Sequence, residues 1–232
     1  TDTTRVDQLD LKLNESTWQH AAYAQWTRAL LPQLDVTLGA RMSYFGQIDA
    51  TSFDPRASLT AHAAPELDLN LSYGRYHQSP SAVYVRAAAG NEALKPLQAD
   101  HYVAGLSYIA RSDVKFTVEA YAKEYADYPV SRDYTEFSLA NTGDVYGVYG
   151  LLFPMVSAGK GRARGIEFYA QKKLTEGLYG QLSYGYSRVE HAALDGVYRR
   201  GGFDAPHTGT VIVGYKKGAA WEFSTRFSYS TG

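Results

Sequence analysis

Apolar and polar residues alternate with a period of two along most of this sequence. In the segment 113–123, Val114 and Phe116 fall on one face, whereas Lys115 and Thr117 fall on the other. Successive side chains of a β-strand point to opposite faces, so the alternation predicts strands with one apolar and one polar face. It predicts ten strands, at about residues 20–30, 34–45, 55–63, 67–77, 99–110, 114–127, 163–174, 178–190, 207–216 and 220–230. Residues 8–14 alternate in the same way and are a candidate for a further strand.

The predicted strands are long, and their connections alternate between short and long. Most strands run to roughly ten residues or more, the length that a tilted strand needs to cross a bilayer, whereas strands of soluble proteins usually have about five or six. Short turns are expected at 31–33, 64–66, 110–113, 175–177 and 217–219, and long loops near 46–54, 78–98, 128–162 and 191–206. This pattern predicts an all-β fold, an antiparallel transmembrane β-barrel meander with periplasmic turns and extracellular loops.

Aromatic residues are concentrated near the ends of the predicted strands. The chain has 20 tyrosines in 232 residues. Rings with a polar tip favour the headgroup zone of a membrane, so two levels of aromatics on the apolar faces are expected to form interfacial girdles. The expected members are Trp26, Tyr108, Tyr215 and Trp221 beside the short turns, and Tyr44, Tyr73, Tyr184, Tyr186 and Tyr229 towards the long loops. The alternative is that tyrosine simply favours strands.

Composition and motifs exclude several other classes of protein. A formal net charge of -1 argues against nucleic acid as a partner, because proteins that bind it usually carry a basic excess. No stretch approaches the roughly 18 apolar residues of a membrane helix. The absence of cysteine excludes a disulfide framework and a thiolate metal site. The sequence contains neither a Gly-x-Ser-x-Gly motif nor a phosphate loop, and its histidines lack metal-ligand spacing. We therefore expect no enzymatic activity, no cofactor and no metal site.

Several short segments together carry a family resemblance. They are Tyr-Ala-Gln-Trp at 23–26, Asp-Pro-Arg-Ala-Ser-Leu at 54–59, Asn-Glu-Ala-Leu-Lys-Pro at 91–96, Gly-Arg-Ala-Arg-Gly-Ile-Glu at 161–167 and Asp-Ala-Pro-His at 204–207. In this order, and on these hairpins, they resemble the C-terminal half of the barrel of TonB-dependent outer-membrane receptors. Those receptors have a 22-stranded barrel closed by a plug. The resemblance implies that residues 1–232 are a partial barrel domain, a fragment without the plug and the final strands.

The resemblance also implies a function at the outer membrane of a Gram-negative bacterium. We expect energised uptake of a metal chelate such as a ferric siderophore, with the lipid bilayer as one partner. TonB, ExbB and ExbD would act through the plug and the N-terminal segment that this sequence lacks. Two alternatives remain open at this point. One is a ten-stranded outer-membrane protease resembling the omptins, and the other is a passive porin or adhesin barrel.

The long loops carry the candidate ligand-binding residues. Arginines beside aromatic rings suit an anionic or aromatic chelate, through ion pairing, cation–π contact and stacking. The alternative is that these are ordinary surface residues of the loops. The candidates are Tyr84, Arg86, Arg132, Tyr134, Tyr146, Tyr149, Tyr198, Arg199 and Arg200.

Overall fold

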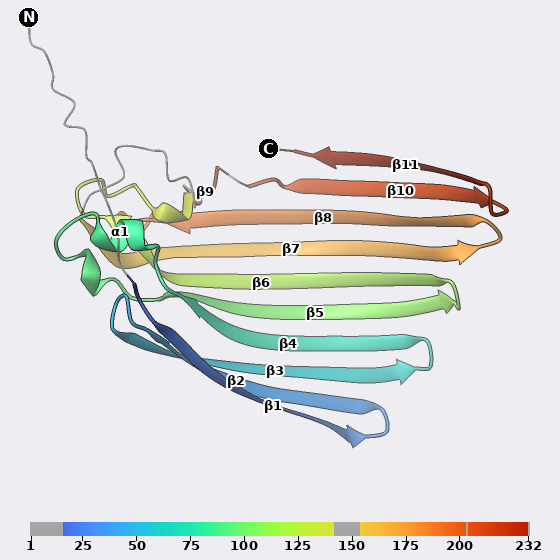
Figure 1. Cartoon of the computed structure of the whole chain (residues 1–232), viewed down its shortest axis with the longest axis horizontal. Coiled ribbons are helices and arrows are strands. Elements are labelled where there is room, and N and C mark those ends of the chain that lie inside the picture. Colours follow the sequence, from blue (N-terminus) through green and yellow to red (C-terminus); the bar gives the residue numbers. More distant parts are fainter. Residues whose placement is uncertain (1–15, 142–153, 203, 232) are drawn as a thin grey trace, which may run out of the picture.

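The long strands form one antiparallel sheet in the computed structural model, which describes residues 16–141, 154–202 and 204–231 (Figure 1). The sheet is a meander in the order β1-β2-β3-β4-β5-β6-β7-β8-β10-β11, and the short β9 pairs with β8. The all-β meander of ten long strands is therefore confirmed. Its strands are β1 (Gln19–Leu31), β2 (Leu34–Phe45), β3 (Ala50–Ala64), β4 (Leu67–Gln78), β5 (Leu97–Arg111), β6 (Val114–Ser131), β7 (Met155–Thr175), β8 (Leu178–Ala192), β9 (Arg199–Arg200), β10 (His207–Lys217) and β11 (Trp221–Ser230).

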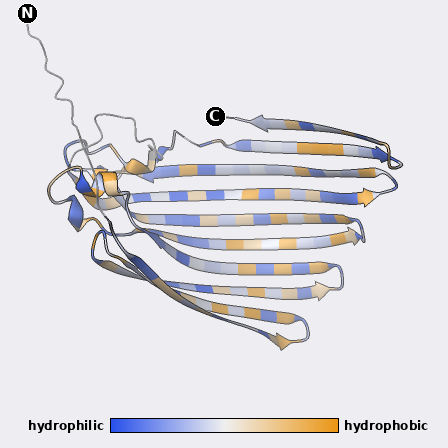
Figure 2. Ribbon diagram, in the orientation of Figure 1, coloured by the Kyte–Doolittle hydropathy of each residue, from blue (hydrophilic) through white to orange (hydrophobic). Residues whose placement is uncertain are grey.

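The register of the strands separates the side chains into two faces. Val118 of β6 pairs with Leu106 of β5 and Phe168 of β7, whereas the adjacent Thr117 pairs with Ser107 and Tyr169. We call the face that carries Val118 the apolar face and the face that carries Thr117 the polar face. Figure 2 shows the same alternation of hydropathy along the strands. The sheet is a single layer, so large side chains of the apolar face stay exposed.

The short turns match the prediction, but two long loops are shorter than expected. The strand β3 begins at Ala50, because Ala50 continues the pairing with Phe45 of β2. Likewise, β6 continues to Ser131, which pairs with Met155 at the start of β7. The predicted loop bounds 46–54 and 128–162 are therefore too wide. Local sequence around Gly159 suggested a loop, but pairing with the neighbouring strand keeps it extended.

A small core lies among the long connections, where Figure 1 places the helix α1 (Ala82–Arg86). We call this cluster of buried side chains the loop core. It joins the β2–β3 turn, α1, the segment after it and the start of β7, and consists of Phe45, Ile48, Tyr84, Val85, Leu94 and Met155. The short 3-10 helices η1 (Asn91–Ala93) and η2 (Leu139–Asn141) lie in the same loops.

A buried asparagine fixes the loop core. The Nδ2 of Asn91 donates to the carbonyl of Tyr84, and its Oδ1 accepts from the backbone N–H of Met155, both at 2.8 Å. A polar side chain out of contact with water is tolerated because it satisfies backbone groups that would otherwise lack partners. Asn91 thus connects the second long loop to the third.

Two expectations concern other parts of the chain. The candidate strand at 8–14 lies outside the described residues. Among the helices of the described ranges, none has the length and apolar character to span a membrane.

Candidate functional site

A row of aromatic and basic side chains crosses the polar face at its long-loop end. The guanidinium of Arg56 lies 4.5 Å from the ring centroid of Tyr76. The Tyr76 ring lies 4.7 Å from that of His101, which lies 6.5 Å from that of Tyr125. The Tyr125 ring then meets Tyr128 edge to face at 5.8 Å. We call these five residues, contributed by β3, β4, β5 and β6, the aromatic row.

The aromatic row depends on small residues opposite its rings. Tyr76 pairs across the strands with Ala99, which in turn pairs with Tyr125. A Cβ added to Gly74 would lie only 2.7 Å from the hydroxyl of Tyr76. The Tyr76 ring therefore lies over a position that has no side chain of its own, and a larger residue at position 74 would force this ring to shift.

A cavity of about 420 Å³ continues the aromatic row into the loops. It is lined by Gln78, Ser79 and Pro80 at the end of β4, by Tyr84 of α1, and by Tyr128. The cavity combines amide and hydroxyl groups with aromatic rings, and the row adds the guanidinium of Arg56. Together they offer stacking surfaces, hydrogen bonds and one positive charge, which suits a large polar ligand with aromatic or anionic groups.

The predicted loop residues are not gathered at one point. Tyr84 is only 7% exposed and packs in the loop core, although it also lines the cavity. Arg86, Arg132 and Tyr134 are exposed. Tyr146 and Tyr149 lie outside the described residues. For the exposed positions, contact with a ligand stays a prediction.

The structure separates the neighbouring residues Tyr198, Arg199 and Arg200. Arg199 pairs with His191 of β8 and bonds to Asp195 at 2.6 Å, which clamps the fourth long loop. Arg200 pairs instead with Glu190, a residue of the opposite face. The Tyr198 ring lies 4.2 Å from the guanidinium of Arg162. The three residues therefore cannot act as one cluster, because alternation in β9 sends the two arginines to different faces.

The clamp in the fourth loop is electrostatic. The hydrogen bond from Arg199 is the main reason why the pKa of Asp195 lies below its ordinary value, and the backbone N–H of Val197 lowers it further. The backbone N–H of Asp195 donates to the carbonyl of Thr135 at 3.1 Å. This hydrogen bond connects the fourth long loop to the third.

The aromatic row is not among the binding residues predicted from the sequence. The alternation of the sequence puts Tyr76 on the polar face of its strand, whereas the sequence-based prediction uses tyrosines only as girdle or loop residues. The available signal was an aromatic residue on the polar face within a few positions of a long loop. No such signal exists for Tyr128, because the register shifts between Tyr125 and Tyr128.

The nine predicted girdle residues all fall on the apolar face. In the register, Trp26 pairs with Leu38, Tyr108 with Phe116, and Tyr184 with Phe168. Eight of the nine are at least one-third exposed, and Tyr73 is half-buried and donates its hydroxyl to Asp100 at 2.8 Å. Their position in a membrane interface stays a prediction.

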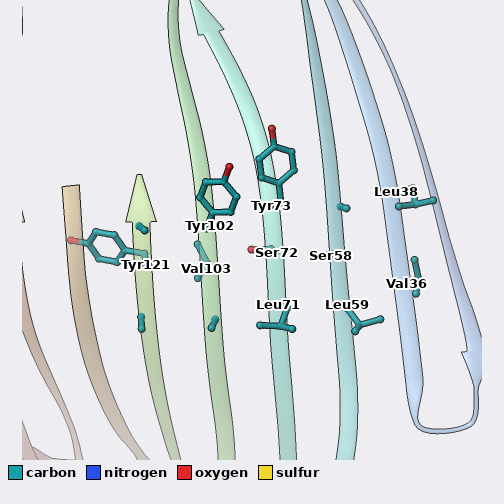
Figure 3. A pocket seen from close by; sticks show the side chains of 14 residues that line it. Val36, Leu38, Ser58, Leu59, Leu71, Ser72, Tyr73, Tyr102, Val103 and Tyr121 are labelled. Carbon is teal, nitrogen blue, oxygen red and sulfur yellow. The ribbon is translucent and has the colours of Figure 1, made fainter. Parts of the chain in front are cut away.

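A hollow of about 710 Å³ lies over β2 to β6 and is lined mainly, though not entirely, by side chains of the apolar face. Figure 3 shows Leu38, Leu59 and Leu71 beside Tyr73 and Tyr102 around it. Its small residues on the apolar face include Ala57, Ala104 and Ala120. The hollow offers few polar groups for a specific hydrogen bond, so it is a weaker candidate than the aromatic row for a polar ligand.

Potential metal ligands are not grouped into a metal centre. Within the described ranges, no cluster of three or more His, Cys, Asp or Glu side chains could hold an ion. His62 on the polar face bonds through Nδ1 to Asp68 at 2.7 Å and through Nε2 to Asp35 at 3.1 Å. These hydrogen bonds engage both of its ring nitrogens.

Comparisons with known proteins find one family and several solved structures that are similar to this chain. A family model described as TonB dependent receptor-like, beta-barrel, matches residues 2–232. No curated protein matches the chain. Among solved structures, the ferric-catecholate import receptor Fiu from K12 E. coli is similar with a TM-score of 0.70 and 12% sequence identity. The match covers 93% of this chain and 35% of that receptor.

Two further solved structures are similar to the same extent. The alcaligin outer-membrane receptor FauA from Bordetella pertussis has a TM-score of 0.66 and 16% identity, with 93% of this chain and 37% of that chain covered. The ferripyoverdine receptor of the outer membrane of Pseudomonas aeruginosa has a TM-score of 0.65 and 14% identity, with coverage of 90% and 30%. This chain therefore spans about a third of the length of the receptors that it resembles.

Proposed function

Because this chain belongs to the TonB-dependent receptor β-barrel family, a family of outer-membrane proteins, we propose that it is part of a receptor for a metal chelate such as a ferric siderophore. In a barrel of the outer membrane, the apolar face meets lipid and the polar face meets the lumen. This orientation places the aromatic row on the inner wall of the barrel, at its long-loop end.

The aromatic row is the observation that carries the proposal. Arg56, Tyr76 and His101 present a cation and stacked rings on one face, next to the cavity under the loops. An anionic chelate with aromatic groups can pair with the guanidinium and stack on the tyrosines. The similar structures include receptors for ferric catecholate, alcaligin and ferripyoverdine, which supports this choice of ligand class.

Energy coupling through TonB is the second part of the proposal. Its support is family membership rather than any residue of this chain. A wall and a binding surface can hold a ligand but supply no energy for its movement. We infer that the complete receptor binds its ligand without TonB and needs TonB for uptake.

The decisive experiment measures binding and uptake separately. A strain that lacks the gene receives the complete protein, and uptake of iron-55 is measured with a ferric catecholate, a ferric hydroxamate and ferric citrate. We expect one chelate to be taken up, and the variant Tyr76→Ala/Tyr125→Ala to weaken its binding by about tenfold, the effect of losing two stacking contacts. Deleting tonB should abolish uptake but leave binding intact.

The matched control is Tyr169→Ala, which removes a tyrosine from the polar face of β7 away from the aromatic row. Tyr169 pairs with Thr117 and Ser183, and its hydroxyl lies 3.4 Å from Gln181. Binding by this variant should equal that of the natural protein. Equal losses in both variants would contradict a specific role for the row. If none of the three chelates is bound, the ligand class is wrong, and uptake that survives loss of TonB would identify a passive channel.

A further inference from the structure

At the long-loop end of the apolar face, the side chains change from aromatic to charged within two residues along a strand. On β8, Tyr184 and Tyr186 are followed on the same face by Arg188 and Glu190. Two residues along a strand span about 7 Å. The aromatic rings thus mark the edge of the surface that faces lipid. The charged groups begin beyond this edge, within a distance comparable to the thickness of a headgroup layer.

The same change occurs on other strands. On β4 and β5, the paired Tyr73 and Tyr102 are followed by the paired Arg75 and Asp100. On β7, Arg164 and Arg162 follow Ile166, which pairs with Tyr186. The charged level therefore continues across several strands instead of being a feature of one loop.

One part of this charged level encloses a cavity. The cavity has a volume of about 570 Å³ and lies between the long-loop end of β8 and the start of β10. It is lined by Tyr186, Arg188, Arg200, His207 and Thr231, together with Ser187 and Pro206. Arg188 and Arg200 come from β8 and β9, and the register places both on the apolar face.

Nearly buried carboxylates position the two guanidiniums. Glu190 accepts from Nε and Nη2 of Arg188 at 3.0 and 2.6 Å, and Asp204 accepts from Nε of Arg200 at 2.6 Å. The side chains of Glu190 and Asp204 are 10% and 2% exposed, whereas those of Arg188 and Arg200 are 61% and 58% exposed. The carboxylates thus hold the arginines, while much of each arginine side chain remains open to the surroundings.

The groups around the cavity suit a phosphate. A guanidinium has five N–H donors, and these described contacts use two in Arg188 and one in Arg200. Its planar fork matches phosphate oxygens. Glu190 also accepts from Arg162 at 2.7 Å, so three arginines face two carboxylates, and the local formal charge is +1. The ring of His207, bonded through Nδ1 to the Tyr184 hydroxyl at 2.8 Å, adds a further polar group.

We propose that this cavity binds the phosphorylated headgroup of a lipid in the outer leaflet. A lipid is favoured over free phosphate because the cavity opens on the face that meets lipid, directly beyond the rings of Tyr184 and Tyr186. On the same face below these rings, Leu182 and Val211 form an apolar surface on which acyl chains can lie. The site lies on the opposite side of the wall from the aromatic row and is independent of the ligand proposed for uptake.

The test uses the complete receptor in detergent and two lipid probes. One probe is lipid A with both phosphates, and the other has the same sugars and acyl chains without phosphate. Binding is measured by native mass spectrometry. The natural protein should bind the phosphorylated probe about tenfold more tightly, and Arg188→Gln/Arg200→Gln should remove that preference, because it removes two charge-assisted contacts. Arg226→Gln, a change on the polar face of β11, is the matched control and should retain the preference.

Several results would overturn the proposal. One is equal binding of both probes by the natural protein, a measurement that needs no variant to fold. A second is an unchanged preference in the folded double variant. A third arm adds inorganic phosphate: displacement of the lipid at equal molar concentration would identify a site for free phosphate, whereas retention of the lipid supports the headgroup.

Discussion

The strand wall and the loop core are stabilised in different ways. In the wall, neighbouring strands pair over long stretches and the side chains of both faces remain largely exposed. In the loop core, short irregular segments pack six buried apolar residues around the contacts of Asn91. The stability of the wall therefore depends on its ladder of backbone hydrogen bonds and on whether each face meets lipid or water. The loop core depends on side-chain burial, as a soluble domain does.

This difference implies different responses to mutation. A side chain of the wall has few tertiary neighbours, so its identity matters mainly through the medium on its face. A side chain of the loop core has specific partners, so its loss affects the loops that share it. Three predictions test the comparison, beginning with the largest expected effect.

A charge placed on the apolar face of the wall should have the largest effect. Val118 lies between Leu106 and Phe168 and away from both ends of β6. In the complete protein, Val118→Arg should lower the free energy of unfolding in phospholipid vesicles by about 2–4 kcal/mol, because an arginine near the middle of the bilayer is costly. Denaturant titration measures the change.

The control lies one residue away on the polar face. Thr117→Arg places the same side chain beside Ser107 and Tyr169, and we expect little change in unfolding free energy because the inner side of such a barrel is polar. Similar losses in the two variants would show that the faces are not distinguished by lipid and water.

Removal of the buried amide should disturb the loops and spare the wall. Asn91→Ala leaves the Tyr84 carbonyl and the Met155 N–H without their 2.8 Å partners. Each unsatisfied buried group costs about 1–3 kcal/mol. We expect faster hydrogen exchange in the segments around α1 and residue 155, with unchanged exchange in the middle of β4 and β5.

The wall also contains a matched asparagine. Asn70 accepts from the hydroxyl of Thr60 at 2.8 Å on the polar face, where water can replace the lost contact. Asn70→Ala should change stability by no more than about 0.5 kcal/mol. If both asparagine variants leave loop exchange unchanged, the loop core does not depend on Asn91.

Acid should loosen the fourth loop, with the smallest of the three effects. The pKa of Asp195 is lower in the folded loop than its ordinary value of 3.8, chiefly through the hydrogen bond from Arg199. Its stabilisation is therefore complete above that ordinary value and is lost as the pH falls through the lower folded value. The protection of residues 193–199 against hydrogen exchange, relative to the intrinsic rate at each pH, should fall in this acidic window. The fall should be absent in Asp195→Asn, whose protection is low at every pH; a persistent fall in that variant would assign the effect to another group.

The sequence was informative about the wall because alternation is a local property. Val114 and Lys115 reveal their faces without reference to any other strand, and the turns between long strands were found where the alternation stops. The ends of the strands near the long loops were harder to predict from the sequence. Whether Met155 belongs to a loop or to β7 depends on its pairing with Ser131, which lies across the third loop.

The candidate binding residues were harder to predict than the wall, because their contacts are not local. Tyr84 resembled a surface residue of a loop, and only packing with Phe45 and Met155 places it in a core. Arg199 and Arg200 resembled a basic pair, and only the register with β8 directs them to opposite faces. The aromatic row brings together residues from four strands, so no single segment contains it.

The sequence alone determined that the chain forms long antiparallel strands with one apolar and one polar face, because a period of two is visible within each segment. Its ordered short motifs also indicated the family, which the family match confirms. Only the tertiary structure decided which side chains meet at the long-loop end. Those contacts depend on register and on loop packing between residues distant in sequence, and a one-residue change of register would reverse the face of every side chain in a strand.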